Sequence, residues 1–278
     1  MIYILMTTHN RKEKTLNCVM SLKRALERQI AKGNRIVLLD ADAASSDGTP
    51  EMLEGLKDST FDVKVMGIPS ESYWNTGMRV AMKRAARMAA DDDLIMLIND
   101  DVIFYDGAAD KMIKLLKEKS ADAVVGAFCD SMGSMSYGGV KQKSRHFARF
   151  ELIKPGKDKL CDTFNCNCLI MKKSVMMQTG NLDKQYTHSM GDYDYGLKMK
   201  RKGLKVISSE EYAGCCDDND RKGSWMDRDL PISERIRLKE SPKGLPYRDW
   251  YHFIRKNYGL LPALYHSTTP YIRIFTKH

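Results

Sequence analysis

The chain has 278 residues, 43% of them hydrophobic and 29% charged, and a mean hydropathy of −0.44, which are values typical of a globular protein with a full core. No apolar run approaches the roughly 18 to 20 residues that a membrane-spanning helix needs. The first residues lack the basic leader and the cleavage site of a signal peptide. We therefore expect a cytoplasmic protein, with peripheral contact at the inner face of the plasma membrane left open.

The seven cysteines are an odd number and show no C-x-x-C spacing, so we expect reduced thiols rather than disulfides. The alternative is a zinc site, although the cysteines do not have the usual ligand spacing. Its candidate ligands are Cys161, Cys166, Cys168 and either Cys215 or Cys216.

The net charge of +9 is concentrated in residues 221–278, which hold 12 Lys/Arg and 5 Asp/Glu together with 9 aromatic residues. Such a segment fits contact with an anionic membrane surface, and a solvated basic rim is the alternative. Nucleic acid is disfavoured as a partner, because no recognised binding motif accompanies the isoelectric point of about 9.1.

The first hundred residues alternate patterns of buried strands with patterns of amphipathic helices. We expect strands at residues 2–7, 35–40, 63–66 and 94–98, and helices at 12–31, after the turn at 43–48, and at 76–90. This alternation predicts an α/β fold with a single, Rossmann-like, mostly parallel sheet flanked by helices.

The second half is less regular. Residues 131–144 are expected to form loops or a hairpin, 164–171 and 204–207 strands, and 190–202 a helix. From about residue 217 onward, proline, glycine and aromatic residues predict an irregular C-terminal extension with one or two helices.

In an open α/β sheet, ligands bind at the carboxyl ends of the strands, and here every such end in the first half is polar. The four predicted ends are Thr7-Thr8-His9-Asn10-Arg11, Asp40-Ala41-Asp42 with Ser45 to Thr49, Tyr73 to Arg79, and Asn99-Asp100-Asp101. No G-x-G-x-x-G, Walker A or G-x-S-x-G pattern is present, which disfavours dinucleotide dehydrogenases, P-loop NTPases and α/β-hydrolases.

Two of these patterns suggest chemistry. The adjacent carboxylates of Asp100 and Asp101 suit a hard divalent cation shared with diphosphate oxygens, although an inert acidic pair at a strand end is the alternative. Asp192, at the start of a predicted helix, fits a general base for a hydroxyl group or, alternatively, a helix cap.

These motifs resemble glycosyltransferase family 2, whose members have the GT-A fold. Thr8-His9-Asn10-Arg11 is similar to the T-Y-N-R of that family, Asp40 to Thr49 to its D-D-x-S-x-D-G-T element, Asn99-Asp100-Asp101 to its DXD-type metal signature, and Gly191 to Gly203 to its E-D-x-D…R…G block. A bacterial surface-polysaccharide subgroup is most similar. Its W-N-x-G-M-R, N-D-D, Y-G-G, C-D-T-F-N-x-N, H-x-x-G-D-x-D-Y-G-L and K-G-L-P blocks occur here at Trp74, Asn99, Tyr137, Cys161, His188 and Lys243.

The resemblance implies a catalytic domain at residues 1–216, with a nucleotide-sugar half at about 1–104 and an acceptor half at about 105–216. Residues 217–278 would form a basic, aromatic wrap within the same domain. It also implies an inverting, metal-dependent transfer of a sugar from a nucleotide donor, a UDP-sugar as first choice, to a glycan or lipid-linked glycan.

The implied site has four groups of residues. Asp192 would be the catalytic base, and Asp101, helped by Asp100, would bind Mn²⁺ or Mg²⁺. The nucleotide-sugar would contact Thr8, Asn10, Asp40 or Asp42, Asn75, Gly77, Arg79, Asn99 and Asp100, with Gly77 permitting close backbone approach. The acceptor would contact Trp225, His188 and Asp194, although for Asp194 we expect rather that it holds the helix or orients Asp192.

Three departures from the family pattern affect this assignment. The element from Asp40 to Thr49 is about two residues longer than usual, so either Asp40 or Asp42 could meet the base. Gly191 replaces the usual Glu before the catalytic Asp, and Cys166 replaces the usual Gly of N-G-N. A sugar nucleotidyltransferase and a non-catalytic nucleotide-sugar-binding protein are the alternative functions.

Overall fold

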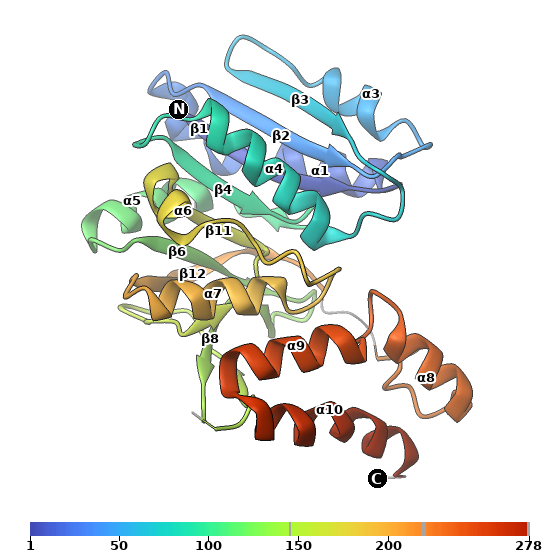
Figure 1. The fold of residues 1–278 in the computed structure, drawn as a ribbon. Helices are drawn as coiled ribbons and strands as arrows, with labels where there is room; N and C mark the ends of the chain where they lie inside the picture. The colour runs from blue at the N-terminus through green and yellow to red at the C-terminus, as the bar shows by residue number, and fades with distance from the viewer. Residues whose placement is uncertain (145, 218–220, 277–278) are drawn as a thin grey trace.

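The computed structural model describes residues 1–144, 146–217 and 221–276. Its main sheet has the strand order β3-β2-β1-β4-β11-β6-β12-β5, with β7 paired to β6 (Figure 1). These strands are β1 (Ile2–Thr8), β2 (Ile36–Asp42), β3 (Phe61–Gly67), β4 (Leu94–Ile98), β5 (Ile103–Phe104), β6 (Ala123–Cys129), β7 (Met135–Tyr137), β11 (Cys168–Lys172) and β12 (Val206–Cys215). All four strands expected in the first half are present.

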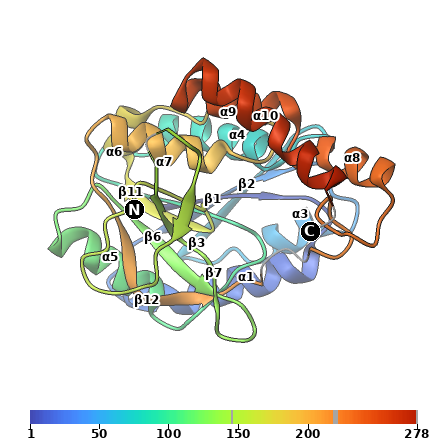
Figure 2. The ribbon, with the colours of Figure 1, turned by 90° about the horizontal axis from the view of Figure 1, so that it is seen from below.

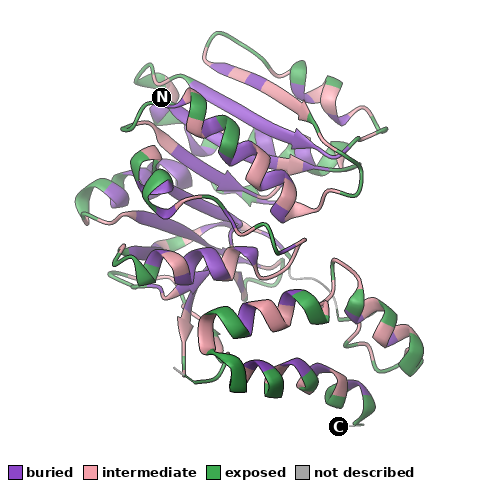
Figure 3. Ribbon diagram, viewed as in Figure 1, coloured by how far each residue is buried: buried purple, intermediate pink, exposed green. Residues whose placement is uncertain are grey.

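The sheet is parallel through its first half and mixed beyond it. β1 pairs in parallel with β2 and β4, and β2 pairs in parallel with β3. β11 is inserted antiparallel between β4 and β6, and β12 returns parallel to β6. Every residue of β2 and β6 is buried, as expected for strands covered on both faces (Figure 3). The expected mostly parallel α/β fold is therefore confirmed.

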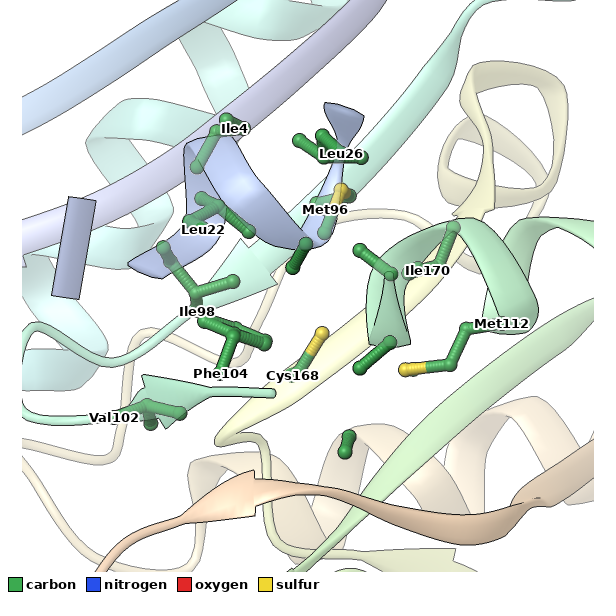
Figure 4. Packing of buried hydrophobic residues seen from close by; sticks show 14 of the residues in the cluster. Ile4, Leu22, Leu26, Met96, Ile98, Val102, Phe104, Met112, Cys168 and Ile170 are labelled. Atoms are coloured by element: carbon green, nitrogen blue, oxygen red, sulfur yellow. The ribbon is translucent and has the colours of Figure 1, made fainter. Parts of the chain in front are cut away.

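Helices cover both faces of this sheet (Figures 1 and 2). One face packs on α1 (Lys12–Ala25), α2 (Glu27–Ala31), α3 (Thr49–Glu54) and α5 (Ala108–Glu118), and the other on α4 (Trp74–Met88), α6 (Lys173–Thr179) and α7 (Gly191–Arg201). Ile4, Ile98 and Phe104 pack against Leu22 of α1 and Met112 of α5 in the first of these two cores (Figure 4). Residues 105–130, for which the sequence predicts no element, supply α5 and β6.

A small antiparallel sheet, which the sequence does not predict, lies beside the main one. It consists of β8 (Gly139–Gln142), β9 (Phe150–Leu152) and β10 (Thr163–Phe164), in the order β10-β8-β9. α7 packs closely on β10, since a Cβ atom at Gly196 would lie 2.4 Å from Thr163 Oγ1. Thr163 Oγ1 also donates a 2.7 Å hydrogen bond to the carbonyl of Tyr193. This contact fixes the first turn of α7.

The expectation of an irregular C-terminal extension with one or two helices is wrong. Within the described residues after 220, the chain forms α8 (Ile232–Glu240), α9 (Tyr247–Tyr258) and α10 (Leu260–Phe275). Pro231 and Pro246 stand immediately before α8 and α9, a position where proline does not interrupt the helical hydrogen bonds. Phe253 and Ala263 are buried with Tyr186, which joins α9 and α10 to the main body. No helix in the described ranges is both long and apolar enough to cross a membrane.

Candidate active site

Thr8 joins the carboxyl ends of β1 and β2. Its Oγ1 lies 2.8 Å from Asp40 Oδ2 and 3.1 Å from Asp42 Oδ1, and all three residues are buried. The backbone N–H of Ser45 also donates to Asp42 Oδ2 at 2.8 Å, whereas Asp40 Oδ1 has no hydrogen-bond partner among the described residues. Burial raises the pKa of Asp40 well above its usual range, opposed by the Thr8 hydroxyl and assisted by the charge of Asp42. Asp40 therefore retains the free acceptor atom of this pair.

The loop after β2 is held by side chains that follow β1 and that belong to the loop itself. Asn10 Oδ1 accepts a 2.8 Å hydrogen bond from Ser46 N, and Asn10 adopts a left-handed conformation with φ 50°. Asp47 accepts hydrogen bonds from Lys12 N at 2.9 Å and from the hydroxyl of Thr49 at 2.6 Å. Asn10 thus holds the loop in addition to any contact with a ligand.

Arg11 connects the two carboxylates that follow β4. Its Nη1 lies 3.1 Å from Asp100 Oδ1 and 2.8 Å from Asp101 Oδ2. Burial raises the pKa of Asp100 to about 6, although the Arg11 charge opposes this shift. The Asp101 side chain is 30% exposed, so it faces solvent more than Asp100, at 9%. The expected carboxylate pair is therefore present, with an arginine that the sequence assignment missed despite its place in the T-H-N-R block.

The first turn of α4 contacts two other parts of the chain, the end of β4 and the loop before α7. Trp74 Nε1 donates a 2.8 Å hydrogen bond to Asn99 Oδ1. Asn75 is buried, and its Nδ2 donates to the carbonyls of Asp183 and Tyr186 at 2.9 and 2.8 Å. A Cβ atom at Gly191 would lie 2.2 Å from Asn75 Oδ1. The glycine that replaces the usual family Glu is therefore the residue that allows this packing.

Gly77 and Arg79 have structural contacts that account for them without a ligand. A Cβ atom at Gly77 would lie 2.2 Å from Thr7 Oγ1, so the glycine lets α4 pack on β1. Arg79 Nε donates to the carbonyl of Leu182 at 3.2 Å, and the side chain of Asn181 donates to the Arg79 carbonyl at 3.0 Å. Neither contact places these two residues beside the carboxylate pair.

Asp192 lies in the first turn of α7, directly after the N-cap residue Met190 and Gly191. It does not cap the helix. Its Oδ1 accepts a 2.8 Å hydrogen bond from Tyr193 N, and its Oδ2 accepts one from Cys166 N at 3.3 Å. Burial raises the pKa of this carboxyl to about 6, although both N–H groups favour the charged form.

The dipeptide Cys166-Asn167 joins this carboxylate to the pair after β4. Cys166 N contacts Asp192, and the carbonyl of Asn167 accepts a 3.3 Å hydrogen bond from Asn99 N. The side chain of Asn167 contacts Cys216 Sγ, which in turn lies 3.9 Å from Asp101 Oδ1. The block that contains the unusual Cys166 therefore links the predicted base to the predicted metal ligands through a chain of contacts.

His188 lies near this place and is edge-on to Tyr73, with ring centroids 6.0 Å apart. Burial, assisted by the charges of Lys243 and Arg11, lowers the pKa of His188 to about 4, so its ring is neutral. Its Nδ1 is buried without a hydrogen-bond partner among the described residues. The neighbouring Ser189 donates to the Gly244 carbonyl at 3.0 Å, which brings the K-G-L-P block to the same side.

The two remaining acceptor candidates lie elsewhere. Both oxygens of Asp194 accept hydrogen bonds from α9, from Lys256 Nζ at 2.6 Å and from Asn257 Nδ2 at 3.1 Å. Asp194 thus holds α7 to α9, which is the helix-holding role considered for it beside acceptor binding. Trp225 lies in the loop before α8, and its carbonyl accepts a 3.1 Å hydrogen bond from Arg235 Nε. No contact in the described residues joins Trp225 to the carboxylates.

The residues present fit a hard divalent cation better than zinc. In the described part of the chain, all seven cysteines are free thiols, and no group of three or more His, Cys, Asp and Glu side chains could hold a metal ion. The Sγ atoms of Cys129 and Cys215 lie 3.5 Å apart, beside Tyr105 rather than beside a ligand set. Asp100 and Asp101 offer two carboxylates, the number that Mg²⁺ or Mn²⁺ takes from a protein when substrate phosphates complete its shell.

Carboxylates gather here at the carboxyl ends of parallel strands, the edge at which open α/β sheets bind their ligands. The family is known from its sequence model. The model of glycosyl transferase family 2 matches residues 3–177, more than half of the chain, so the chain belongs to that family and is a glycosyltransferase. No curated protein matches it.

Solved structures share the fold. The mannosyltransferase PcManGT from Pyrobaculum calidifontis, in complex with GDP-Man and Mn²⁺, has a TM-score of 0.58 and 12% identity over 98% of this chain and 73% of its own. S. aureus TarS 1-349 in complex with UDP-GlcNAc has a TM-score of 0.59 and 10% identity over 99% of this chain and 81% of its own. At this identity the similarity concerns the fold alone, and it confirms the expected GT-A architecture.

Proposed function

We propose that the protein is an inverting, metal-dependent glycosyltransferase that moves a sugar from a nucleoside diphosphate to a hydroxyl group of a glycan or lipid-linked glycan. The observation that carries this proposal is the contact of Cys166-Asn167 with both Asp192 and the strand end at Asn99. Two neighbouring residues thus connect Asp192, a carboxylate with a raised pKa, to the strand end that carries the carboxylate pair.

Asp192 would act as the general base. A carboxylate with a pKa of about 6 is charged at neutral pH, and it is basic enough to accept a proton from a hydroxyl group as that group attacks. Attack on the anomeric carbon from the side opposite the leaving nucleotide breaks the glycosidic bond to phosphate in the same step, with inversion. The proton passes from the acceptor hydroxyl to the Asp192 carboxylate.

The donor would lie across the ends of β1, β2 and β4. Asp40 Oδ1, the free acceptor of the Thr8 network, is the preferred partner for an N–H group of the base, with Asp42 as the alternative. Asn99 is held by Trp74 at the edge of the same site. Arg11 and Lys243, whose charges both reach His188, would attract the diphosphate.

Asp101 and Asp100 would hold Mn²⁺ or Mg²⁺, which when bound supplies Lewis-acid stabilisation of the negative charge that develops on the departing diphosphate. The chain's own part is to hold both carboxylates in place, which Arg11 does through its guanidinium group. PcManGT was solved with Mn²⁺, which supports a divalent ion in this fold.

The donor and acceptor are proposed from similarity. PcManGT and TarS were solved with GDP-Man and UDP-GlcNAc, which supports a nucleoside diphosphate sugar, and a UDP-sugar remains our first choice. The blocks shared with the bacterial surface-polysaccharide subgroup favour a surface glycan as acceptor. If this glycan is linked to a lipid, the protein would encounter it at the inner face of the membrane.

Replacement of the base tests the proposal. We expect Asp192→Asn to lower the rate of sugar transfer by about 10²- to 10⁴-fold, because the amide cannot accept the proton, and to leave nucleotide affinity unchanged. The measurement is transfer of labelled sugar from each donor to a glycolipid extract, together with calorimetric titration of the nucleotide.

The matched control is Asp106→Asn. It makes the same change at a carboxylate that is 76% exposed, pairs with Arg24 and has no role in the proposed site. Transfer at the parental rate by Asp192→Asn would remove the base assignment. Release of pyrophosphate from a nucleoside triphosphate and a sugar phosphate, in place of sugar transfer, would identify a nucleotidyltransferase.

A further inference from the structure

α10 has an apolar face that is open to solvent. Its buried residues Ala263, Ser267, Pro270 and Ile274 follow the spacing of one helix face. Figure 3 draws this helix with both buried and exposed stretches. Its large exposed residues follow the spacing of the opposite face: Leu261 is 78% exposed, Leu264 52%, Tyr265 60%, Ile272 53% and Phe275 60%. We call these five residues the α10 stripe. The solvent-exposed face of a surface helix usually carries charged and polar side chains instead.

The stripe belongs to a helix that is fixed in place. Trp250 Nε1 of α9 donates a 2.8 Å hydrogen bond to the His266 carbonyl, and Arg235 Nη1 of α8 donates at 2.9 Å to the Ile274 carbonyl. Tyr271 also contacts Glu240 of α8 through its hydroxyl group. Both halves of α10 are therefore held from the inner side, so the outward direction of the stripe is a property of the fold.

The segment that carries the stripe has ionised side chains of one sign, although Glu240 of α8 contacts its inner side. Residues 250–278 contain no Asp or Glu and four Lys or Arg. Arg255 of α9 and Arg273 of α10 are exposed. A second copy of the chain docked on this face would bring like charges together, whereas an anionic lipid surface supplies the opposite charge and an apolar layer beneath it.

We propose that the α10 stripe lies in the interfacial layer of an anionic membrane, with Arg255 and Arg273 facing lipid headgroups. The helix has 16 residues and would lie on the membrane without crossing it. α8, α9 and α10 lie together at one end of the molecule (Figure 1).

This inference deepens the proposed function, because it places the acceptor end of the site near a lipid surface. Lys256 of α9 binds Asp194 of α7 at 2.6 Å, and the first turn of α7 carries Asp192. α9 thus contacts both α10, which would meet the membrane, and α7, which carries the proposed base. This arrangement suits an acceptor carried on a lipid.

The test is co-sedimentation of the full chain with vesicles, in the absence of nucleotide and acceptor. We expect binding to vesicles of phosphatidylglycerol and phosphatidylcholine at low salt, with at least about tenfold weaker binding to phosphatidylcholine alone. Leu261→Ser combined with Leu264→Ser should weaken binding to the anionic vesicles by about tenfold or more, because two apolar side chains leave the interface. Arg255→Gln combined with Arg273→Gln should reduce the preference for phosphatidylglycerol.

Met132→Ser is the matched control, since Met132 is an apolar residue that is 88% exposed between β6 and β7. It should bind as the parent does. All variants should retain the parental melting temperature, because the changed side chains are exposed. The proposal is overturned by an absence of binding to anionic vesicles at low salt, or by unchanged binding of the double leucine variant. A concentration-dependent dimer that the leucine changes abolish would identify a second copy as the occupant instead. None of these results depends on sugar transfer, so a failure here leaves the proposed function standing.

Discussion

Arg11 explains how two adjacent carboxylates can stand at the end of a buried strand. Without a cation, Asp100 and Asp101 would repel each other in a site from which water is partly excluded. The guanidinium group contacts both and is itself partly exposed. A bound metal ion would supply further positive charge to the same two carboxylates, which Arg11 holds in place.

We expect Arg11→Gln to lower the free energy of unfolding of the metal-free protein by about 1–2 kcal/mol. This is less than for a fully buried ion pair, because Arg11 and Asp101 are partly exposed. Added Mn²⁺ should raise the melting temperature of this variant more than that of the parent, because the ion replaces the lost positive charge. Differential scanning fluorimetry with and without Mn²⁺ measures both effects.

Arg24→Gln is the control for Arg11, since it removes an ion pair with Asp106 whose partners are 56% and 76% exposed. It should change stability by less than about 0.5 kcal/mol and should not alter the response to Mn²⁺. An Arg11→Gln protein with parental stability and a parental metal response would contradict the role assigned to Arg11.

The pH dependence of turnover reports on Asp192. Because burial raises its pKa to about 6, the base is protonated and inactive below that pH and charged above it. At saturating donor and metal, we expect kcat to rise about tenfold per pH unit up to about pH 6 and then to level off. Steady-state kinetics in buffers of constant ionic strength measures this limb.

Asp100 titrates in the same range, since burial also raises its pKa to about 6. Its protonation should weaken binding of donor and metal and should therefore appear in KM for the donor. A kcat that stays constant across this pH range would argue against Asp192 as the base.

At the residue scale, side chains that form hydrogen bonds at strand ends could be predicted from the sequence. Contacts that depend on the packing of one element on another could not. Thr8, Asp40 and Asp42 form one network, and Asp100 lies beside Asp101, because strand ends position them directly. The contact of Gly77 with Thr7 depends on how α4 meets β1, which no local pattern shows. Arg11 was missed for a similar reason, since its contact with Asp100 spans 89 residues.

At the scale of elements, α7 and α9 are held together by a cluster of charges. Lys256 Nζ lies 2.6 Å from Asp194 Oδ2 and 2.7 Å from Asp183 Oδ2. The Asp194 side chain is 2% exposed, and Lys256 is the cation that contacts it. His252 adds a 3.1 Å contact to Asp183. The cluster ties the C-terminal helices to the helix that carries Asp192.

We expect Lys256→Met to lower the free energy of unfolding by about 2 kcal/mol, because it leaves the Asp194 carboxylate buried without a cation. Urea unfolding measures the loss. A second variant, Lys256→Met with Asp194→Asn, should recover part of it, because the buried charge is also removed.

Lys111→Met provides the comparison, since Lys111 and Glu211 form an ion pair that is 66% and 70% exposed. Its effect should stay below about 0.5 kcal/mol. Equal stabilities of the Lys256 and Lys111 variants would show that the cluster does not hold the C-terminal helices.

The elements of the first half could be predicted because each strand and helix there has a clear period and a clear end. Those of the second half could not, for two physical reasons. β8, β9 and β10 are strands of four residues or fewer, too short to show a clear period, and β10 pairs with β8 across more than 20 residues. In the C-terminal segment, the prolines favour irregular structure when only the sequence is considered, whereas in the structure Pro231 and Pro246 stand directly before helices.

At the scale of the whole molecule, Cys166-Asn167 connects the carboxyl end of β4 with the first turn of α7. The ends of β1, β2 and β4 supply the Thr8 network and the carboxylate pair, and the first turn of α7 supplies Asp192. A cavity of about 590 Å³ beside Met1, Leu94 and Val175 contains none of these residues. The proposed chemistry therefore depends on the strand ends and not on this cavity.

The measurement that tests the central claim most directly is a thermal-shift titration with UDP, GDP, dTDP and CMP, each with and without Mn²⁺. The account predicts a rise of about 5 °C or more with one nucleotide at about a hundredfold excess over its Kd, which requires Mn²⁺ and is lost in Asp101→Ala. No rise with any of the four, or an equal rise in Asp101→Ala, would contradict a metal-dependent nucleotide site at the ends of β1, β2 and β4.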